Sequence, residues 1–290
     1  MSDIDPAQLD KTGKVILDDV YNQKTPVSFY RAIEQLDYKL PQLAKPVLTK
    51  ILKLLEQKKG RPDLKLVDLG CSYGVNATLL KWNFGLDEVF THHESNPEQA
   101  VEWSEQIRLD QNWLKTNEPR LLNIVGVDIA QNALDYALAA KIIDGTVCGN
   151  FEKQTLDSTQ RNKVRDADLL ISTGCIGYVT QATIAALLDA MAPKQPWMVH
   201  FVLRMFSFDD VERLANERGY ETIKSRHPVR QRKFASKEEQ QNALERLSTM
   251  SVDTKGYEDD GRYYADFFLS RPKGESQAPL PADLQELFIV

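Results

Sequence analysis

Val67-Asp-Leu-Gly-Cys-Ser-Tyr-Gly-Val-Asn-Ala77 carries the strongest structural signal in the chain. The apolar run over 64–69 is typical of a buried strand, and residues 75–82 follow it with a helix-like pattern. Gly70 and Gly74 lie in the loop between them, where a side chain would occupy the space of a ligand. Because ligands of open parallel sheets bind beyond the carboxyl ends of the strands, this unit predicts a nucleoside site.

The spacing of the loop residues restricts which nucleoside fits. The dinucleotide-binding pattern is G-x-G-x-x-G, but Ser72 and Val75 stand where its second and third glycines would be. A P-loop is excluded because no Gly-Lys-Ser or Gly-Lys-Thr follows. The tight turn that holds a pyrophosphate is therefore not encoded.

Strand-like and helix-like segments alternate on the carboxyl side of this loop. We predict helices at 132–140, 180–190 and 209–218, and strands at 121–127, 145–148, 167–172 and 197–203. Parallel neighbours need crossover connections, and helical crossovers cover both faces of a sheet. We therefore expect an α/β fold with a doubly wound, mostly parallel sheet, completed by an antiparallel strand over 263–269 at or near its edge.

Regions outside this alternation complete the expected organisation. Helical periodicity over 27–58 is broken at Pro41 and Pro46. The basic stretch 224–233 is interpreted as a solvated loop, with the steering of an anionic acceptor as the alternative. We predict a helical cap over 1–60, a Rossmann-like domain over 61–272 with a helical insertion over 83–120, and a tail over 273–290.

Composition limits the class of protein. The chain has 290 residues, of which 42% are hydrophobic, and 36 basic against 42 acidic side chains give a net charge of −6. This composition favours a globular fold, and the acidic balance argues against nucleic-acid partners. Three cysteines cannot all pair with one another, which favours a reducing compartment. With no signal-peptide pattern and no apolar run of the ~18–20 residues that span a bilayer, we expect a cytoplasmic protein with no membrane partner.

The glycine loop resembles motif I of the class I, Rossmann-like, S-adenosylmethionine-dependent methyltransferases. That motif is an acidic residue, one apolar residue, and then G-x-G-x-G or G-C-G-x-G. Its positions are occupied here by Asp68, Gly70, Cys71, Ser72 and Gly74, with the serine in place of the middle glycine. The resemblance implies that these residues bind S-adenosylmethionine.

Val125-Gly-Val-Asp-Ile129 resembles motif II of the same family. The resemblance implies that Asp128 accepts hydrogen bonds from both ribose hydroxyls and that Ile129 lies against adenine. Asp128 follows the glycine loop at a much greater distance than the about 20 residues of a Rossmann unit. Either the predicted insertion accounts for the excess, or the ribose-binding acid is one of the pair at 87–88. A cap at the start of the following helix is a further alternative for Asp128.

Two later segments also resemble family landmarks. Gly149-Asn-Phe-Glu152 resembles the segment that reads the adenine edge, which implies cofactor-binding roles for Asn150 and Phe151. The run 168–174 resembles motif IV, whose strand end faces the transferred methyl group. This part of the resemblance implies that Thr173 and Gly174 bind the cofactor.

Few residues predict the chemistry of the transfer itself. Tyr178 follows the fourth predicted strand and His200 lies in the fifth, and both are candidate catalytic bases for an oxygen acceptor. The alternative for His200 is a hydrogen-bonded core histidine. Candidate acceptor-binding residues are Tyr30, Tyr178 and Arg204, with an ion pair to a protein acid as the alternative for Arg204.

Two other groups of reactive side chains are given structural interpretations. His92-His93-Glu94 is interpreted as a solvated loop and not as a metal site, because consecutive side chains diverge. Cys71 and Cys175 are interpreted as buried or loop thiols, since no adjacent base is evident. We therefore expect no metal.

The resemblance covers about residues 60–205 and predicts methyl transfer from S-adenosylmethionine to an oxygen or nitrogen atom of a small molecule. Displacement at a sulfonium methyl needs mainly alignment of the reactants in a dry site. This requirement agrees with the lack of an evident catalytic triad. Two alternatives are a methyltransferase that acts on RNA or protein, and a non-catalytic module that binds adenosine or a nucleotide. The acceptor and the oligomeric state are left open.

Overall fold

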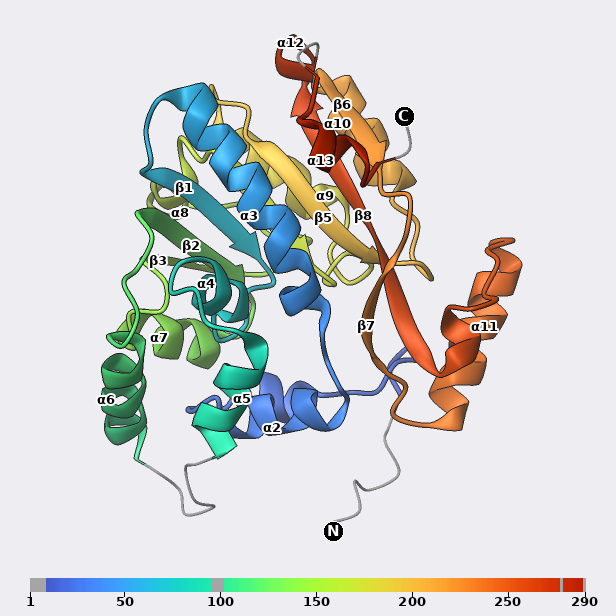
Figure 1. Cartoon of the computed structure of the whole chain (residues 1–290), viewed down its shortest axis with the longest axis horizontal. Coiled ribbons are helices and arrows are strands. Elements are labelled where there is room, and N and C mark those ends of the chain that lie inside the picture. The colour runs from blue at the N-terminus through green and yellow to red at the C-terminus, as the bar shows by residue number, and fades with distance from the viewer. Residues whose placement is uncertain (1–8, 95–101, 277–278, 289–290) are drawn as a thin grey trace.

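The computed structural model describes residues 9–94, 102–276 and 279–288 (Figure 1). The strands are β1 (Leu64–Leu69), β2 (Leu122–Asp128), β3 (Gly145–Cys148), β4 (Leu169–Thr173), β5 (Trp197–Leu203), β6 (Tyr220–Lys224), β7 (Val229–Lys233) and β8 (Arg262–Pro272). The helices are α1 (Asp18–Tyr21), α2 (Val27–Gln35), α3 (Leu40–Lys59), α4 (Val75–Leu80), α5 (Leu86–Glu94), α6 (Trp103–Leu114), α7 (Gln131–Ala139), α8 (Ser158–Val164), α9 (Gln181–Met191), α10 (Asp209–Glu217), α11 (Lys237–Thr249), the 3-10 turn η1 (Glu258–Asp260), α12 (Lys273–Ser276) and α13 (Ala282–Gln285).

The strands form one sheet in the order β3-β2-β1-β4-β5-β8-β6, with β7 paired to β8. β1 to β5 are parallel, and β8 is antiparallel to β5, β6 and β7. The chain runs from β1 outward to β2 and β3 and then returns to β4 on the other side of β1. This order is that of a doubly wound, Rossmann-type sheet. The predicted fold class is therefore confirmed.

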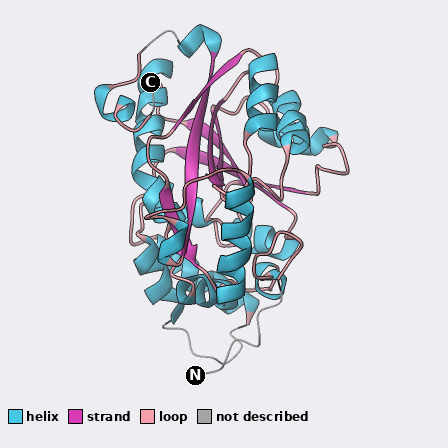
Figure 2. Ribbon diagram, turned by 90° about the vertical axis from the view of Figure 1, so that its right-hand side faces the viewer, coloured by secondary structure: helices cyan, strands magenta, loops and turns pink. Residues whose placement is uncertain are grey.

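Helices cover both faces of the sheet, which Figure 2 shows nearly edge-on. α3 contacts α4 and packs against β1 and β4. α9 contacts α8 and α10, which lie behind the sheet in Figure 1. One cluster of buried apolar side chains extends through these interfaces into α2. The core is therefore continuous from the amino-terminal helices to the sheet.

The loop after β1 has a left-handed backbone at three positions. The φ angle is 75° at Gly70, 49° at Ser72 and 82° at Gly74. Gly74 precedes α4, and a Cβ atom there would lie 2.6 Å from Cγ2 of Ile142. Glycine at position 74 thus lets α4 pack closely against the connection between α7 and β3.

α3 continues through Pro46, where the sequence predicted a break. Pro41 lies in the first turn, where a missing amide hydrogen leaves no intrahelical bond unmade. Pro46 lies inside the helix, and the turns on both sides of it bury Ala44, Leu48 and Ile51. This packing against the sheet outweighs the hydrogen bond that proline removes.

The basic stretch contains β7, and the interpretation of this stretch as a solvated loop is therefore wrong. β7 pairs with β8 through a register shift. Gln231 and Arg232 are each 5% exposed. The guanidinium of Arg232 pairs with the buried carboxylate of Glu239 on α11, which makes burial of the cation tolerable. β7 is therefore part of the interior.

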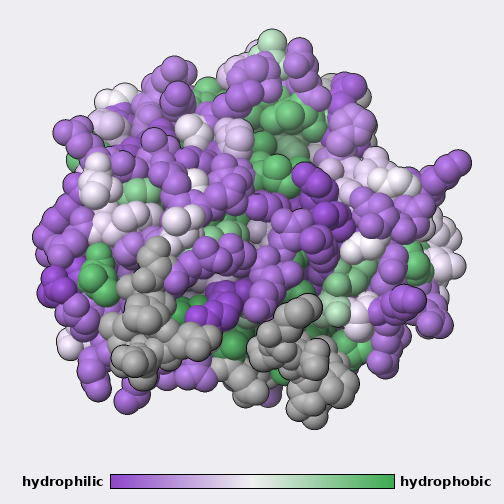
Figure 3. All heavy atoms as spheres, turned by 60° about the horizontal axis from the view of Figure 1, so that its bottom comes forward, coloured by the Kyte–Doolittle hydropathy of each residue, from purple (hydrophilic) through white to green (hydrophobic). Residues whose placement is uncertain are grey.

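The surface is largely polar. Figure 3 shows mostly hydrophilic residues on the face that looks out from the lower end of Figure 1, with hydrophobic residues confined to patches between them. Within the described ranges, no helix has both the length and the apolarity needed to cross a bilayer. The carboxy-terminal tail is docked at Phe288, whose buried ring lies 5.0 Å from that of Phe267 between centroids.

Candidate functional site

A cavity of about 750 Å³ lies at the carboxyl ends of β1 to β4. The strand order reverses between β1 and β4 at this edge. The lining comes from the loops after these strands, from α2, from β7 and from the amino-terminal segment 10–21. Ligand sites commonly measure about 300–1,000 Å³. The cavity therefore has room for a nucleoside cofactor together with a small second ligand.

Asp128 ends β2 and lines the cavity. Its Oδ2 accepts a hydrogen bond of 2.8 Å from the Ser72 amide, and its Oδ1 accepts one of 3.0 Å from the Ala130 amide. Burial raises the pKa of this carboxyl, whereas the amide hydrogen bonds act in the opposite direction. Each carboxylate oxygen has a second lone pair. Asp128 therefore holds the glycine loop and still offers two acceptors to a ligand.

The two alternatives for Asp128 do not fit the structure. Asp87 lies on α5, outside the cavity lining, and pairs with Lys39 at 2.9 Å. The helix α7 starts after Ala130, and the Asn132 amide in its first turn donates a hydrogen bond of 2.9 Å to Oδ1 of Asn22 and not to Asp128. The long separation from the glycine loop is explained by α5 and α6, which the chain forms between β1 and β2.

Asp68 lies beneath the cavity and not in its lining. The side-chain amide of Asn76 donates hydrogen bonds of 3.0 Å to Oδ1 of Asp68 and to Oγ1 of Thr173. Burial raises the pKa of Asp68 to about 7, against the effect of the Asn76 hydrogen bond. Sequence reasoning missed Asn76, because an asparagine in the first turn of a helix has no pattern of its own. In the structure it connects Asp68 to the cavity.

Two buried polar atoms near the glycine loop lack partners. Neither Oγ of Ser72 nor Oδ2 of Asp68 has a hydrogen-bond partner among the residues that the structure describes. Buried polar atoms in proteins nearly always have one. Ser72 lines the cavity. Of the two atoms, only Oγ of Ser72 belongs to the lining, where a ligand could complete its hydrogen bonding.

Residues predicted to contact adenine lie along one wall. Ile129, Asn150 and Phe151 all line the cavity. Ile129 is 70% exposed, so it offers an apolar surface to a flat ligand. Glu152, which the sequence did not single out, accepts a hydrogen bond of 2.6 Å from the Thr183 hydroxyl. This bond holds the loop after β3 against α9.

Glycines bring the loops after β1 and β4 close together. A Cβ atom at Gly70 would lie 2.8 Å from Cβ of Cys175, and one at Gly174 would lie 2.8 Å from Nε2 of Gln231. The glycine loop therefore adjoins Cys175, and the residue before Cys175 adjoins Gln231. Burial raises the pKa of the Cys175 thiol to about 12 and that of Cys71 well above its usual value. These values agree with unreactive thiols.

Tyr178 lines the cavity but is anchored to the amino-terminal segment. Its hydroxyl donates a hydrogen bond of 2.8 Å to Oδ2 of Asp10, and Nζ of Lys14 lies 4.9 Å from the centre of its ring. Burial raises the pKa of the Tyr178 hydroxyl. A donating phenol with a raised pKa is a poor proton acceptor. The predicted role of Tyr178 as a base therefore does not fit the structure, whereas a place in the cavity wall does.

Glu239 fixes the amino-terminal segment over the cavity. This buried carboxylate accepts hydrogen bonds from the Val15 amide at 2.7 Å, from the Ala235 amide at 2.7 Å and from both terminal nitrogens of Arg232 at 2.6 and 2.9 Å. Burial acts to raise the pKa of Glu239, but the bonds from Arg232 lower it. Glu239 therefore remains a carboxylate that joins the distant amino-terminal segment to β7 and to the start of its own helix α11.

Three other predicted site residues lie outside the lining. Arg204 donates a hydrogen bond of 2.8 Å to Glu258, so its partner is a protein acid and not an acceptor. Tyr30 stacks on His93 with ring centroids 4.3 Å apart, beneath α5. Gly74 packs against the α7–β3 connection. The acceptor-binding roles of Arg204 and Tyr30 and the cofactor-binding role of Gly74 do not fit these positions.

His200 is a core histidine. Its side chain is fully buried, and its Nδ1 lies 2.8 Å from Oγ of Ser172 on β4. Burial lowers the pKa of His200 to about 3. The ring lies outside the cavity lining. The predicted role of His200 as a catalytic base is therefore wrong, because its strand turns it into the core.

The pH dependence of stability tests this assignment of His200. The unfolded chain binds a proton near pH 6.5, whereas the folded pKa is about 3, so stability falls as the pH drops below about 6.5. The expected contribution is a loss of about 2 kcal/mol between about pH 7.5 and pH 5. Carboxyls whose pKa is raised on folding, such as that of Asp68, make the opposite contribution, because they increase stability as the pH falls. The quantity to measure is therefore the difference in unfolding free energy between wild type and His200→Asn, from urea titrations at both pH values. A difference independent of pH would contradict the assignment.

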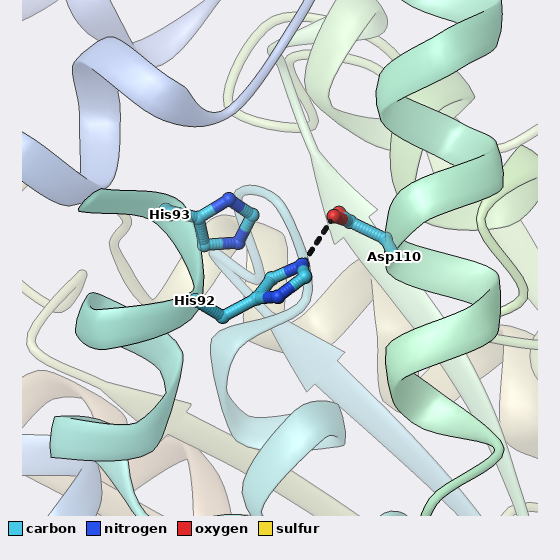
Figure 4. Close-up of side chains that lie close together, drawn as sticks. All are labelled: His92, His93 and Asp110. Carbon is cyan, nitrogen blue, oxygen red and sulfur yellow. Dashed lines mark hydrogen bonds and ion pairs between the residues drawn. The ribbon is translucent and has the colours of Figure 1, made fainter. Parts of the chain in front are cut away.

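His92, His93 and Asp110 form a polar cluster between α5 and α6 (Figure 4). Nε2 of His92 lies 2.8 Å from Oδ1 of Asp110, and the Tyr136 hydroxyl donates to Oδ2 at 2.6 Å. Burial acts to raise the pKa of Asp110, but these hydrogen bonds lower it. His93 is 5% exposed. The solvated-loop interpretation is therefore wrong, because both rings turn toward α6 at the end of α5. We assign a structural role to this cluster, which joins α5, α6 and α7.

Comparison with known proteins gives one partial sequence match. No protein-family model matches the chain. A component of the aspartyl/glutamyl-tRNA(Asn/Gln) amidotransferase from Albidiferax ferrireducens is 35% identical over 72 residues. The match covers 23% of this chain and 15% of the relative. The chain thus spans a small part of the length of this curated relative, whose activity is not carried over to it.

Several solved methyltransferase structures are similar to the chain. The plantazolicin methyltransferase BamL, crystallised with a triazolic desmethylPZN analog and SAH, is 12% identical, with a TM-score of 0.46 over 84% of this chain and 89% of that one. Magnesium protoporphyrin IX methyltransferase from Synechocystis PCC 6803, with bound SAM, is 14% identical, with a TM-score of 0.41 over 92% and 100%. A TehB-like SAM-dependent methyltransferase from Corynebacterium glutamicum is 13% identical, with a TM-score of 0.38 over 75% and 85%. Identities this low show a shared fold and do not by themselves assign a function.

Proposed function

We propose that this protein is an S-adenosylmethionine-dependent methyltransferase that acts on a small-molecule acceptor. The observation that carries the proposal is the charge beside the glycine loop. The ionisable groups there are acids, with Asp128 in the lining and Asp68 beneath it. The cations of the lining, Lys11, Lys14 and Arg232, belong to the amino-terminal segment and to β7. A ligand with a sulfonium and an ammonium suits this arrangement, whereas a pyrophosphate would face acids.

The residues present fit each part of the cofactor. Asp128 has two free lone pairs for the ribose hydroxyls, and its backbone partners hold it in place. Ile129 and Phe151 offer apolar surface to adenine. The Ser72 hydroxyl, which has no partner among the described residues, provides a polar atom for the amino-acid part.

The chain contributes alignment and exclusion of water to the reaction. When bound, S-adenosylmethionine supplies an electrophilic methyl group on a good leaving group. Phe29, Ile33 and Tyr38 from the α2 region form an apolar wall of the cavity, and residues 10–17 lie across it. A wall of this kind holds an acceptor near the methyl group and keeps water away, which is most of what this displacement needs. Enclosure of the cavity by these segments favours a small acceptor, methylated on oxygen or nitrogen.

Ligand titration tests the proposed cofactor. Isothermal calorimetry with S-adenosylmethionine, S-adenosylhomocysteine and NAD is expected to give affinities for the first two at least about 100-fold higher than for NAD, because the charges beside the loop oppose a pyrophosphate. Binding of NAD with similar affinity, and none of the sulfonium, would overturn the proposal. Incubation with labelled S-adenosylmethionine and a small-molecule extract then separates an enzyme, which releases S-adenosylhomocysteine, from a binding module, which does not.

A further inference from the structure

We propose that the methyl acceptor is a small carboxylic acid with an apolar body, and that Lys14 binds its carboxylate. The inference rests on the proposed function and specifies the acceptor class for the same cavity. It comes from the end of the cavity formed by the amino-terminal segment, β7 and the loop after β4, which the cofactor residues do not occupy.

Lys14 is a buried cation with no ion-pair partner among the described residues. Its side chain is 7% exposed and lines the cavity. Its Nζ lies 4.9 Å from the ring centre of Tyr178 and 5.7 Å from that of Tyr263, and no carboxylate pairs with it in the described ranges of the chain. Buried cations normally have a paired anion, as Arg232 has in Glu239. The missing anion is what a ligand would supply.

The electrostatic state of Lys14 supports this interpretation. Burial lowers the pKa of Lys14 to about 7, and the charge of Arg232 adds to the effect, whereas Glu239 and Asp10 act against it. The nearby acids therefore offset only part of the cost of burying a positive charge on Lys14. A bound anion would restore the compensation and favour the charged form.

The balance of charge around Lys14 favours a single negative charge on the ligand. Arg232 and Glu239 cancel each other as a bidentate pair. Asp10 lies on the same side and accepts the hydrogen bond of Tyr178. Lys11 and Lys14 against Asp10 leave one net positive charge at this end, which matches a carboxylate, whereas a phosphate dianion would exceed it and would be repelled by Asp10.

Gln231 adds a second polar contact at this end. Its side chain lines the cavity and is 5% exposed, and its Oε1 has no hydrogen-bond partner in the part of the chain described. A hydroxyl or amine on the acceptor would donate to this oxygen. Gln231 adjoins Gly174, next to Cys175 and the glycine loop. A donor group held there lies on the side of the cavity where the methyl group is expected.

The remaining surface at this end is apolar. Tyr21, Phe29, Ile33 and Leu36 line the cavity between the amino-terminal segment and α2. A carboxylic acid with an aromatic or aliphatic body buries apolar surface against these side chains while its charge meets Lys14. The three observations together describe one ligand: an anionic head, an apolar body and a hydrogen-bond donor.

Matched pairs of acids and amides test the proposal. The full chain is saturated with S-adenosylhomocysteine, and calorimetry then measures the binding of benzoate, para-hydroxybenzoate, phenylacetate and octanoate, each beside its primary amide. At least one acid is expected to bind about tenfold or more tightly than its amide, because a charge-assisted hydrogen bond to Lys14 is lost in the amide. Lys14→Met is expected to abolish this preference and to leave the affinity for S-adenosylhomocysteine within twofold of wild type.

Lys24→Met is the matched control, since Lys24 is an exposed lysine near the amino terminus that lies outside the cavity lining. This variant is expected to keep the preference for acids. The proposal is overturned if no acid binds, if amides bind as well as acids, if Lys14→Met keeps the preference, or if phenyl phosphate binds more tightly than benzoate. Loss of S-adenosylhomocysteine binding by the wild type is a separate outcome that contradicts the proposed function itself.

Discussion

Replacement of Asp128 by alanine is expected to lower the affinity for S-adenosylhomocysteine by about 100- to 10,000-fold. Two hydrogen bonds to an ionised acceptor are each worth about 1.5–3 kcal/mol, and the ribose hydroxyls would lose both. The amides of Ser72 and Ala130 would also lose their acceptor, so the glycine loop would no longer be held against β2. Isothermal calorimetry on the folded variant measures the effect.

The control for this variant is Asp135→Ala. Asp135 is an exposed acid on the adjacent helix α7 and accepts a hydrogen bond from the Gln131 side chain. We expect its affinity for S-adenosylhomocysteine to equal that of wild type. Asp128→Asn should fall between the two, since it keeps one side-chain oxygen. If Asp128→Ala bound S-adenosylhomocysteine within threefold of wild type, the ribose-binding role would have to be abandoned.

The largest effect on stability is expected from Glu239→Ala. Removing one partner of a buried ion pair destabilises a protein by about 3–5 kcal/mol, because the other charge is left buried and unpaired. Here the uncompensated group is Arg232, which is 5% exposed, and the amides of Val15 and Ala235 lose their acceptor as well. Urea unfolding followed by circular dichroism measures the loss of unfolding free energy.

A double-mutant cycle separates the charge from the packing. Arg232→Met should also destabilise the protein, because it leaves the Glu239 carboxylate buried without a cation. The single variant Glu239→Leu closes the cycle, and the double variant Arg232→Met with Glu239→Leu should regain at least about 2 kcal/mol relative to Glu239→Leu, since neither charge remains unpaired. Purely additive losses in the cycle would show that the two side chains do not act as a pair.

The central sheet was predictable from local pattern alone. The bounds of β1, β3 and β5 agree with the predicted strands, and the order of elements from residue 64 to residue 217 agrees except for α8, a helix that the sequence did not predict. Each signal is a short apolar run that ends in glycine or polar residues, and such a run is buried in any compact fold. The predicted bounds of β2 and β4 differ by one or two residues, because strand ends depend on the register with neighbours.

The elements that sequence reasoning missed depend on contacts with other helices and strands. β7 contains Arg232, which reads as a solvated cation until Glu239 of α11 is placed beside it. α3 continues through Pro46 because both adjoining turns are packed against the sheet. His93 is buried because Tyr30 of α2 stacks on its ring. In each case a tertiary contact outweighs the local preference of the residue.

Some residues of the candidate site were likewise predictable from the sequence, and others were not. Asp128, Ile129 and Gly174 were found from sequence because each lies at the end of a parallel strand, and strand ends of this kind meet at one edge of the sheet. Their roles toward the cofactor stay predictions until a ligand is measured. What the sequence by itself determined is therefore this edge and the residues that reach it.

Only the tertiary structure decided the other end of the cavity. Lys14 and Gln231 lie more than two hundred positions apart, and the Val15 amide is joined to Glu239 across a separation of 224 residues. No periodicity or motif links segments so distant, since their contact depends on ion pairing and packing formed after the sheet has brought them together. The same physical reason explains why Tyr30, His200 and Arg204 were misplaced: whether a side chain faces a cavity or the core is set by its neighbours in space.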